Sequence, residues 1–160
     1  RETISMYPSG EPMRTVNIKD GYALQLAVKA GFHVAIITGA RTEAVKVRYN
    51  GLGIKDVYTG ASIKKDCLEE LMLMYELSPE EILYMGDDIP DLECMRHVGI
   101  PVAPADACTE VLEVSRYISE YNGGAGAVRD IIEQVLRVQG KWALDCQGVI
   151  ASDANDTASR

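Results

Sequence analysis

Short, uninterrupted apolar segments that alternate with helical patterns are the feature that most restricts how this chain can fold. Residues 33–37, 82–85 and 99–102 form such segments. Continuous rather than alternating apolar character is typical of strands that are covered on both faces in a parallel sheet. Because helical patterns separate these segments, the sequence predicts an α/β fold with a parallel sheet.

Capping signals indicate where the helices begin and end. Asp20 is expected to be the N-cap of a helix that runs to residue 30, and Gly31 is expected to end it in a left-handed conformation. Ser78-Pro79-Glu80-Glu81 has the pattern of a capping box with proline at the first helical position. The other helices are expected over residues 42–50 and 64–75, after the strand at 82–85, and over a last stretch that carries apolar residues at 128, 131, 132, 135 and 136 and is closed by Gly140.

The two ends of the chain are expected to differ from this pattern. Residues 3–18 are predicted to form a β-hairpin around a turn at 8–12, which is rich in proline, glycine and serine. Residues 1–142 are expected to form a single domain. The polar residues 143–160 are expected to be a flexible tail.

Composition excludes several kinds of partner and compartment. The net charge of −8 argues against nucleic acids and anionic membranes as partners. No segment approaches the roughly 18 apolar residues of a membrane-spanning helix. The four cysteines form no Cys-x-x-Cys pair, so a disulfide framework or a zinc site is not expected. The default compartment is therefore the reducing cytoplasm.

The strongest chemical signal is Gly86-Asp87-Asp88-Ile89-Pro90-Asp91, which follows a predicted strand. Carboxylates just beyond the carboxyl end of a strand lie where open α/β sheets build their sites. Adjacent carboxylates raise each other's pKa unless a cation or hydrogen-bond donors compensate. Mg²⁺ suits such a cluster, because it binds through one or two protein carboxylates and completes its shell with water and phosphate. A capped acidic loop, with Asp91 starting the next helix, explains the same residues without a metal.

Other positions suit an anion. Thr38 and Gly39 follow a predicted strand, and a threonine hydroxyl beside free backbone N–H groups can hold a phosphate oxygen. Arg41 could pair with a phosphate or a carboxylate through two N–H bonds. Lys64 begins a predicted helix, where its charge opposes the helix dipole, so another partner is expected to hold it there. Taken singly, these positions are explained as well by a turn, a solvated arginine and a surface pair of Lys64 with Lys65.

The order of these elements is more specific than any one of them. A strand ending in Thr-Gly, a lysine that begins a helix and a strand ending in Gly-Asp-Asp-x-x-Asp resemble the second, third and fourth motifs of the haloacid dehalogenase superfamily. The flanking segments resemble the 3-deoxy-D-manno-octulosonate 8-phosphate phosphatases over residues 3 to about 142. These segments are Gly10-Glu11-Pro12-Met13-Arg14-Thr15, Asn17-Ile18-Lys19-Asp20-Gly21-Tyr22, Ile37-Thr38-Gly39-Ala40-Arg41-Thr42-Glu43, Tyr84-Met85-Gly86-Asp87-Asp88 and Gly123-Gly124-Ala125-Gly126-Ala127-Val128-Arg129.

The resemblance implies a capless, Mg²⁺-dependent phosphatase that hydrolyses a sugar-acid phosphate through an aspartyl-phosphate intermediate. The first expected substrate is 3-deoxy-D-manno-octulosonate 8-phosphate, which belongs to lipopolysaccharide biosynthesis, and a nonulosonate 9-phosphate is the alternative. The expected fold is a Rossmann-like parallel sheet with helices on both faces and a protruding β-hairpin in place of a cap domain. Such proteins are typically homotetramers joined through their hairpins.

The resemblance also implies residue roles. The catalytic group is expected to contain Thr38, Lys64 and Asp88. The metal set is expected to be Asp87, Asp88 and Asp91, of which the last two support either Mg²⁺ or Lys64. Phosphate and substrate contacts are expected from Thr38, Gly39, Arg41, Lys64, Asp20 and Arg129.

The first motif of this family, Asp-x-Asp-Gly-Val, does not occur in the 160 residues. In the family its first Asp attacks phosphorus, and its second Asp protonates the leaving alkoxide. Little phosphatase activity is therefore expected of the 160-residue chain. Asp145-Cys146-Gln147-Gly148 resembles the motif in part, with Gln147 in place of the second Asp. A permuted first motif, chance similarity and an inactive assembly or binding module of the same fold stay open as alternatives.

Overall fold

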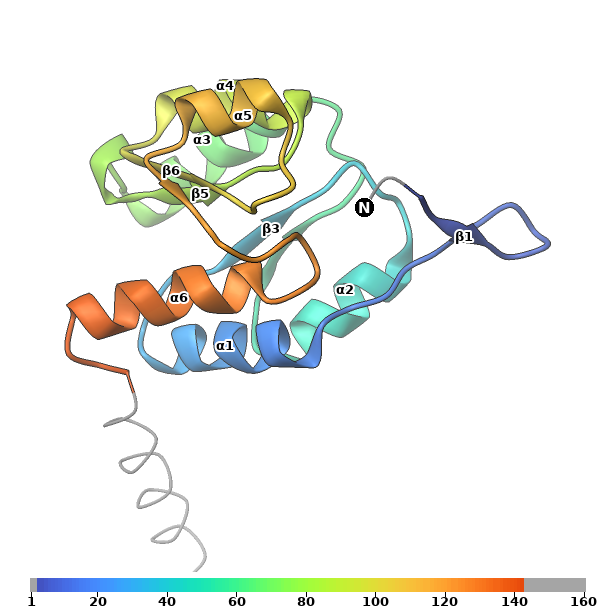
Figure 1. Ribbon diagram of the computed structural model, residues 1–160, viewed down its shortest axis with the longest axis horizontal. Coiled ribbons are helices and arrows are strands. Elements are labelled where there is room, and N and C mark those ends of the chain that lie inside the picture. Colours follow the sequence, from blue (N-terminus) through green and yellow to red (C-terminus); the bar gives the residue numbers. More distant parts are fainter. Residues whose placement is uncertain (1–2, 143–160) are drawn as a thin grey trace, which may run out of the picture.

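Strands and helices alternate along the chain in the computed structural model, which describes residues 3–142 (Figure 1). The strands are β1 (Ser5–Met6), β2 (Pro12–Met13), β3 (Ala35–Ile37), β4 (Asp56–Tyr58), β5 (Leu83–Met85), β6 (Ile100–Ala103) and β7 (Tyr117–Ile118). The helices are α1 (Ile18–Lys29), α2 (Glu43–Asn50), α3 (Lys64–Tyr75), α4 (Leu92–His97), α5 (Thr109–Val114) and α6 (Ala127–Val138), with 3₁₀ turns η1 (Pro79–Glu81) and η2 (Ile89–Asp91). The expected flexible tail, and with it the segment around Asp145, lies outside the described residues.

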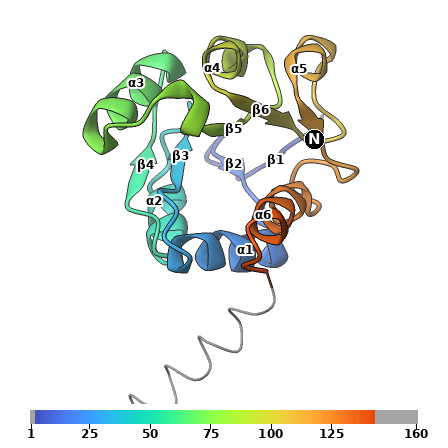
Figure 2. The ribbon, with the colours of Figure 1, turned by 90° about the vertical axis from the view of Figure 1, so that its left-hand side faces the viewer.

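The parallel strands form two ladders. β3 pairs with β4, with Ala35 opposite Asp56 and Ile37 opposite Tyr58. β6 pairs with β5 on one side and with β7 on the other. The predicted α/β class with parallel strands is therefore confirmed. Within residues 3–142, however, no strand bridges the inner strands β3 and β5 (Figure 2).

Helices lie on both faces of the strands, as expected. α3, α4 and α5 lie on one side and α1, α2 and α6 on the other (Figures 1 and 2). α1 and α6 run side by side, while α4 and α5 pack against β6. The antiparallel hairpin of β1 and β2 protrudes from these layers. Over the part of the chain that the structure describes, no helix is long and apolar enough to cross a membrane.

α1 begins three residues earlier than predicted from Asp20. Asn17 is the N-cap, because its side-chain oxygen accepts hydrogen bonds from the N–H groups of Lys19 and Asp20. Asn caps a helix as well as Asp does, and the earlier start places Ile18 in the helix rather than in the hairpin. The predicted cap at Asp20 is thus wrong. At the other end, Gly31 has the expected positive φ of 92°.

The bounds of other elements agree with the sequence where the apolar or capping pattern is clear. α3 begins and ends as expected. Ser78 and Glu81 form the expected capping box, although the turn that they start is a 3₁₀ turn. α5 and β7 were not predicted, because six helical residues and a two-residue edge strand give too little periodicity to detect.

The core beside β5 and β6 contains two apolar clusters that share one tyrosine. The first cluster consists of Leu68, Cys94 and Val98, and the second of Met95, Ala103 and Val111. Tyr84, in the middle of β5, packs against both clusters. Cys94 is a buried free thiol, and Cys67 and Cys108 are also free. This packing fixes β5, and with it the position of the acidic segment that follows the strand.

A glycine is required where β5 ends. A Cβ atom on Gly86 would lie 2.5 Å from the Cβ of Asp91 and 2.6 Å from the Sδ of Met95. We therefore expect Gly86→Ala to lower the free energy of unfolding by roughly 1–3 kcal/mol, the usual range for overpacking. Urea denaturation measures this loss. Gly39→Ala is the matched control, because an added Cβ there meets nothing closer than the carbonyl oxygen of Ala61 at 3.7 Å. Equal losses in the two variants would contradict the close approach at Gly86.

Candidate functional site

The loops that follow β3, β4 and β5 bring the predicted site residues to one edge of the strands. The N–H of Ala61, after β4, donates to the carbonyl oxygen of Thr38, after β3, at 3.0 Å. The N–H of Cys108 donates to the carbonyl oxygen of Asp87, after β5, at 2.9 Å. Backbone bonds thus fix these loops at the carboxyl ends of parallel strands, where α/β folds build their sites.

The Asp91 carboxylate is the centre of this edge. Its Oδ1 accepts hydrogen bonds from the Lys64 ammonium at 2.7 Å and from the Tyr84 hydroxyl at 2.8 Å. Its Oδ2 accepts from the backbone N–H groups of Asp87 at 3.2 Å and Asp88 at 3.4 Å. Only 4% of the Asp91 side chain is exposed. Four donors match the four lone pairs of a carboxylate, so the buried charge is fully satisfied.

These donors also determine how Asp91 ionises. Burial by itself would raise the pKa of Asp91, but the hydrogen bond and charge of Lys64, followed by the Tyr84 hydroxyl, outweigh burial and hold this pKa below its ordinary value. Burial, followed by the charge of Asp91, raises the pKa of the Tyr84 hydroxyl far above its ordinary value. At neutral pH the carboxylate is therefore ionised and the hydroxyl is a donor.

Lys64 and Lys65 are adjacent in the sequence, but their side chains run in different directions and contact different partners. Lys64, the first residue of α3, reaches Asp91, and 19% of its side chain is exposed. Lys65 lies instead near the exposed carboxylates of Glu69 and Glu93, at 3.7 and 3.5 Å. Asp91 is thus the partner that was expected to hold a lysine against the helix dipole.

Asp87 and Asp88 have the donor chemistry that a hard cation needs. Both residues are exposed, in contrast to Asp91. Desolvation by nearby protein atoms, followed by repulsion from Asp91, raises the pKa of Asp87. Asp88 uses one oxygen to accept the N–H of Ile89 at 2.8 Å, which caps η2. A cation beside Asp87 would relieve the repulsion, so these two residues fit Mg²⁺.

The expected set of three metal-binding carboxylates does not form. Within residues 3–142, no three His, Cys, Asp or Glu side chains converge on one metal position. The reason is that Asp91 turns inward, where both of its oxygens accept hydrogen bonds. Of the two roles expected for Asp91, support of Lys64 fits this geometry and direct metal ligation does not.

Thr38 and Gly39 form a turn at the end of β3. The Thr38 hydroxyl accepts the N–H of Ala40 at 3.2 Å, which leaves the donor side of the hydroxyl for another group. This is the turn role that the sequence allowed, and it does not conflict with a role in phosphate binding. The side chain of Arg41 lies along the turn at Gly60, because a Cβ on that glycine would meet the Arg41 Cγ at 3.3 Å. Arg41 therefore lies beside the candidate site.

Asp20 and Arg129 hold α1 and α6 together. Asp20 is buried, and its Oδ1 accepts the backbone N–H of Arg129 at 2.9 Å. The Arg129 guanidinium lies 3.7 Å from Glu133 and 5.4 Å from the centre of the Trp142 ring. Asp20 thus contacts the backbone of α6, and Arg129 contacts Glu133 of α6 and the Trp142 ring beyond it. The expected substrate contacts of both residues stay predictions.

The role of Tyr84 was not predicted. From the sequence this residue is only part of an apolar strand segment, whereas in the structure its hydroxyl donates to the central carboxylate. A usable signal was present, because a tyrosine in a buried strand needs a hydrogen-bond partner.

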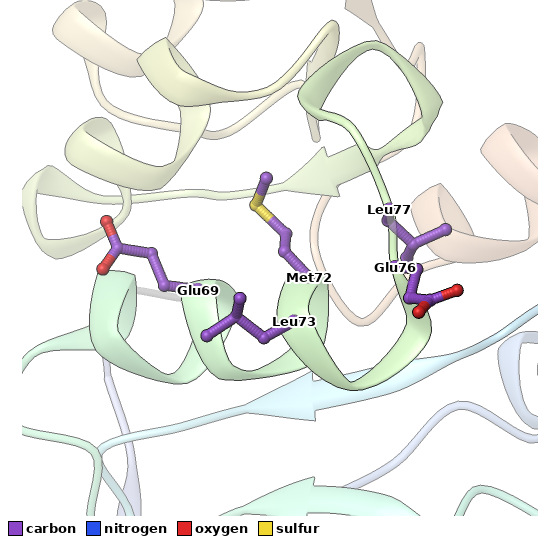
Figure 3. A pocket seen from close by; sticks show the side chains of 5 residues that line it. All are labelled: Glu69, Met72, Leu73, Glu76 and Leu77. Atoms are coloured by element: carbon purple, nitrogen blue, oxygen red, sulfur yellow. The ribbon is translucent and has the colours of Figure 1, made fainter.

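A separate, open pocket of about 580 Å³ lies beside the end of α3 (Figure 3). Its lining consists of Glu69, Met72, Leu73, Glu76 and Leu77, and none of the predicted site residues is among them. Two carboxylates over an apolar surface repel a phosphate group, so this pocket does not fit the chemistry of the carboxyl edge.

The Lys64–Asp91 pair is expected to stabilise the fold. Lys64→Met would leave a buried carboxylate without its main cation, so we expect a loss of about 3 kcal/mol, the lower end of the range for breaking a buried pair. Lys65→Met breaks only exposed pairs and should cost less than about 1 kcal/mol. Urea denaturation at pH 7 compares the two variants, and a larger loss for Lys65→Met would show that the assignment of Lys64 is wrong.

The stability difference between the wild type and Lys64→Met should depend on pH in a defined direction. The pKa of Asp91 is depressed in the folded state, so the stability that the pair contributes is present above the ordinary Asp pKa of about 4 and is lost as the pH falls through the folded-state value. We therefore expect the difference between the wild type and Lys64→Met to narrow as the pH is lowered from 7 to below about 4. Denaturation curves at several pH values measure this difference. A difference that grows in acid would contradict the assigned ion pair.

Comparison with known proteins shows which family the chain resembles. A family model of haloacid dehalogenase-like hydrolases matches residues 56–132. A 3-deoxy-D-manno-octulosonate 8-phosphate phosphatase of Yersinia pestis is 38% identical over 138 residues, which are 86% of this chain and 74% of that protein.

Two solved structures show the same fold. The phosphatase of that name from Moraxella catarrhalis, in complex with magnesium, phosphate and a KDO molecule, has a TM-score of 0.84 and 31% identity, over 94% of this chain and 84% of its own. The cobalt-bound deoxy-D-mannose-octulosonate 8-phosphate phosphatase of Haemophilus influenzae has a TM-score of 0.82 and 28% identity, over 87% of this chain and 81% of its own.

The extent of the match, together with the grouping of Thr38, Lys64 and the acidic segment at one edge, identifies the family. The chain belongs to the haloacid dehalogenase-like hydrolases, in the family of the 3-deoxy-D-manno-octulosonate 8-phosphate phosphatases.

Proposed function

We propose that this protein is a Mg²⁺-dependent phosphatase that acts on 3-deoxy-D-manno-octulosonate 8-phosphate. The observation that carries the proposal is the pair of Lys64 with the buried Asp91, 2.7 Å apart and next to the exposed Asp87. The names of the relatives support the substrate. The Moraxella complex supports magnesium, whereas the cobalt-bound relative supports a divalent cation without favouring magnesium.

Each group at the edge would have one task. Lys64 commits one N–H bond to Asp91 and can direct the other two to phosphoryl oxygens. The Thr38 hydroxyl can donate to a third phosphoryl oxygen. Asp87, assisted by Asp88, would hold Mg²⁺, which when bound supplies positive charge that offsets the charge of the phosphoryl group.

The proposed chemistry proceeds in two steps. A carboxylate oxygen bonds to phosphorus while the bond from phosphorus to the sugar oxygen breaks, and a second carboxylic acid gives its proton to that oxygen. Water then attacks phosphorus, the second group takes a proton from the water, and phosphate leaves as the first carboxylate is restored. We assign these two carboxylates to an extended segment between β3 and β5. The edge of β3 that faces β5, and the edge of β5 that faces β3, support that position. Within the described residues, neither of these two edges has a ladder partner.

The proposal is tested by comparing two forms of the protein. One is the 160-residue chain, and the other carries the Asp-x-Asp-Gly-Val strand of the Yersinia relative joined before Arg1. With Mg²⁺ and 3-deoxy-D-manno-octulosonate 8-phosphate, we expect the second form to release phosphate at least about 100-fold faster, the scale for loss of the general acid–base group alone. In that form Lys64→Met should lower turnover strongly, and the control Lys65→Met should leave it nearly unchanged.

The other readings of the sequence predict different results. Comparable turnover by the 160-residue chain, abolished by Asp145→Asn, would favour the permuted first motif. Faster turnover of a nonulosonate 9-phosphate would overturn the proposed substrate. Binding of phosphate without turnover in either form would favour the inactive binding module. The cytoplasmic location remains a prediction from the cysteine pattern.

We also propose a homotetramer that is joined through residues 3–18. The hairpin and the residues that lead from it into α1 carry exposed apolar side chains, namely Ile4, Met6, Tyr7, Met13, Val16 and Ile18. A two-stranded hairpin is only marginally stable by itself in water, and a contiguous exposed apolar patch commonly marks an interface.

Charge placed on the hairpin should therefore dissociate the oligomer. Met6 is 61% exposed in the single chain, and we expect Met6→Glu to shift the protein toward monomers. Val138→Glu is the control, because Val138 is 88% exposed at the end of α6, away from the hairpin. Light scattering at micromolar concentration measures the mass. A wild-type monomer at that concentration would contradict the proposal.

A further inference from the structure

Tyr84 is anchored more firmly than any other donor side chain that contacts Asp91. Its ring packs against both core clusters, on a strand whose neighbour β6 holds it by a parallel ladder. Lys64, in contrast, reaches Asp91 through a flexible four-carbon chain. The rigid ring therefore gives the Tyr84 hydroxyl a fixed position relative to the core.

The hydrogen-bond lengths show which donors fix the carboxylate. The two short bonds, at 2.7 and 2.8 Å, both reach Oδ1, from Lys64 and Tyr84. The two backbone bonds to Oδ2 are longer, at 3.2 and 3.4 Å. Because charge-assisted bonds strengthen as they shorten, the orientation of the carboxylate depends mainly on the Oδ1 donors. Of these two, only Tyr84 is fixed by its own packing.

We propose that Tyr84 is a positioning residue, whose hydroxyl orients the Asp91 carboxylate so that Asp91 holds the Lys64 ammonium in place for the phosphoryl group. The inference rests on the proposed function for the ligand that Lys64 meets. The arrangement of Tyr84, Asp91 and Lys64 itself does not depend on that ligand.

A purely structural role is the competing explanation, because the ring of Tyr84 also fills the core. Tyr84→Phe keeps the ring and removes only the hydroxyl. Tyr117→Phe is a matched control, since the Tyr117 hydroxyl also donates to an aspartate, Asp130 of α6, at 2.8 Å but belongs to the edge strand β7. Each variant removes one tyrosine–aspartate hydrogen bond of 2.8 Å, the first in a part-buried position and the second in an exposed one.

The first measurement is the affinity of the 160-residue chain for inorganic phosphate with Mg²⁺, by calorimetry. We expect Tyr84→Phe to weaken binding about tenfold, the scale of one hydrogen bond to a charged group, and Tyr117→Phe to leave it unchanged. In a Lys64→Met background, Tyr84→Phe should cause no further loss, because Tyr84 acts through Lys64. An equal loss in both backgrounds, or no loss in the wild-type background, would overturn the inference.

The second measurement needs no ligand. Urea denaturation of the wild type, Tyr84→Phe, Lys64→Met and the double variant forms a double-mutant cycle. We expect the two substitutions to be non-additive, because both act on Oδ1 of Asp91, and the cycle of Tyr117→Phe with Lys64→Met to be additive. If neither the 160-residue chain nor the form with the restored first motif binds phosphate while the Tyr84 cycle is non-additive, the proposed function is overturned and the positioning role stands. An additive Tyr84 cycle would overturn the positioning role.

Discussion

A buried carboxylate is costly to remove from water, and the carboxyl edge of this protein is built around the one at Asp91. An ionised group in the interior persists only when charge and hydrogen bonds compensate its lost hydration. Its donors come from three elements: Lys64 begins α3, Tyr84 lies in β5, and the backbone N–H groups of Asp87 and Asp88 precede η2. Satisfying this one charge therefore fixes the start of a helix, the end of a strand and the conformation of the acidic loop at the same time.

The parallel topology explains why motifs that are far apart in the sequence lie together. Thr38 ends one strand and Asp87 follows another, and parallel strands place their carboxyl ends at the same edge. Lys64 reaches this edge because the loop after β4 is bonded to the loop after β3. This geometry explains how motifs that are separated in the sequence meet at one edge.

Sequence was sufficient where a single local pattern decides the outcome. The strand segments, the bounds of α3 and the helix-ending Gly31 depend on apolar continuity or backbone conformation, and they were predicted. The direction of a side chain depends on neighbours that are distant in sequence. For that reason Asp91 was placed among metal ligands and Asp20 at a helix cap, whereas both are buried acceptors for groups on other elements.

The two ladders are joined by side chains rather than by main-chain hydrogen bonds within the described residues. Two contacts that connect them are the Lys64–Asp91 pair and the apolar cluster around Leu68, against which Ile37 of β3 and Tyr84 of β5 both pack. Apolar contacts of this kind oppose separation of the two half-sheets but oppose their rotation only weakly. The reason is that apolar contacts have little directional preference, whereas the hydrogen bonds of a ladder are directional. The relative twist of the two half-sheets is therefore less constrained than their separation, and at the carboxyl edge the Lys64–Asp91 pair spans the line along which they would twist.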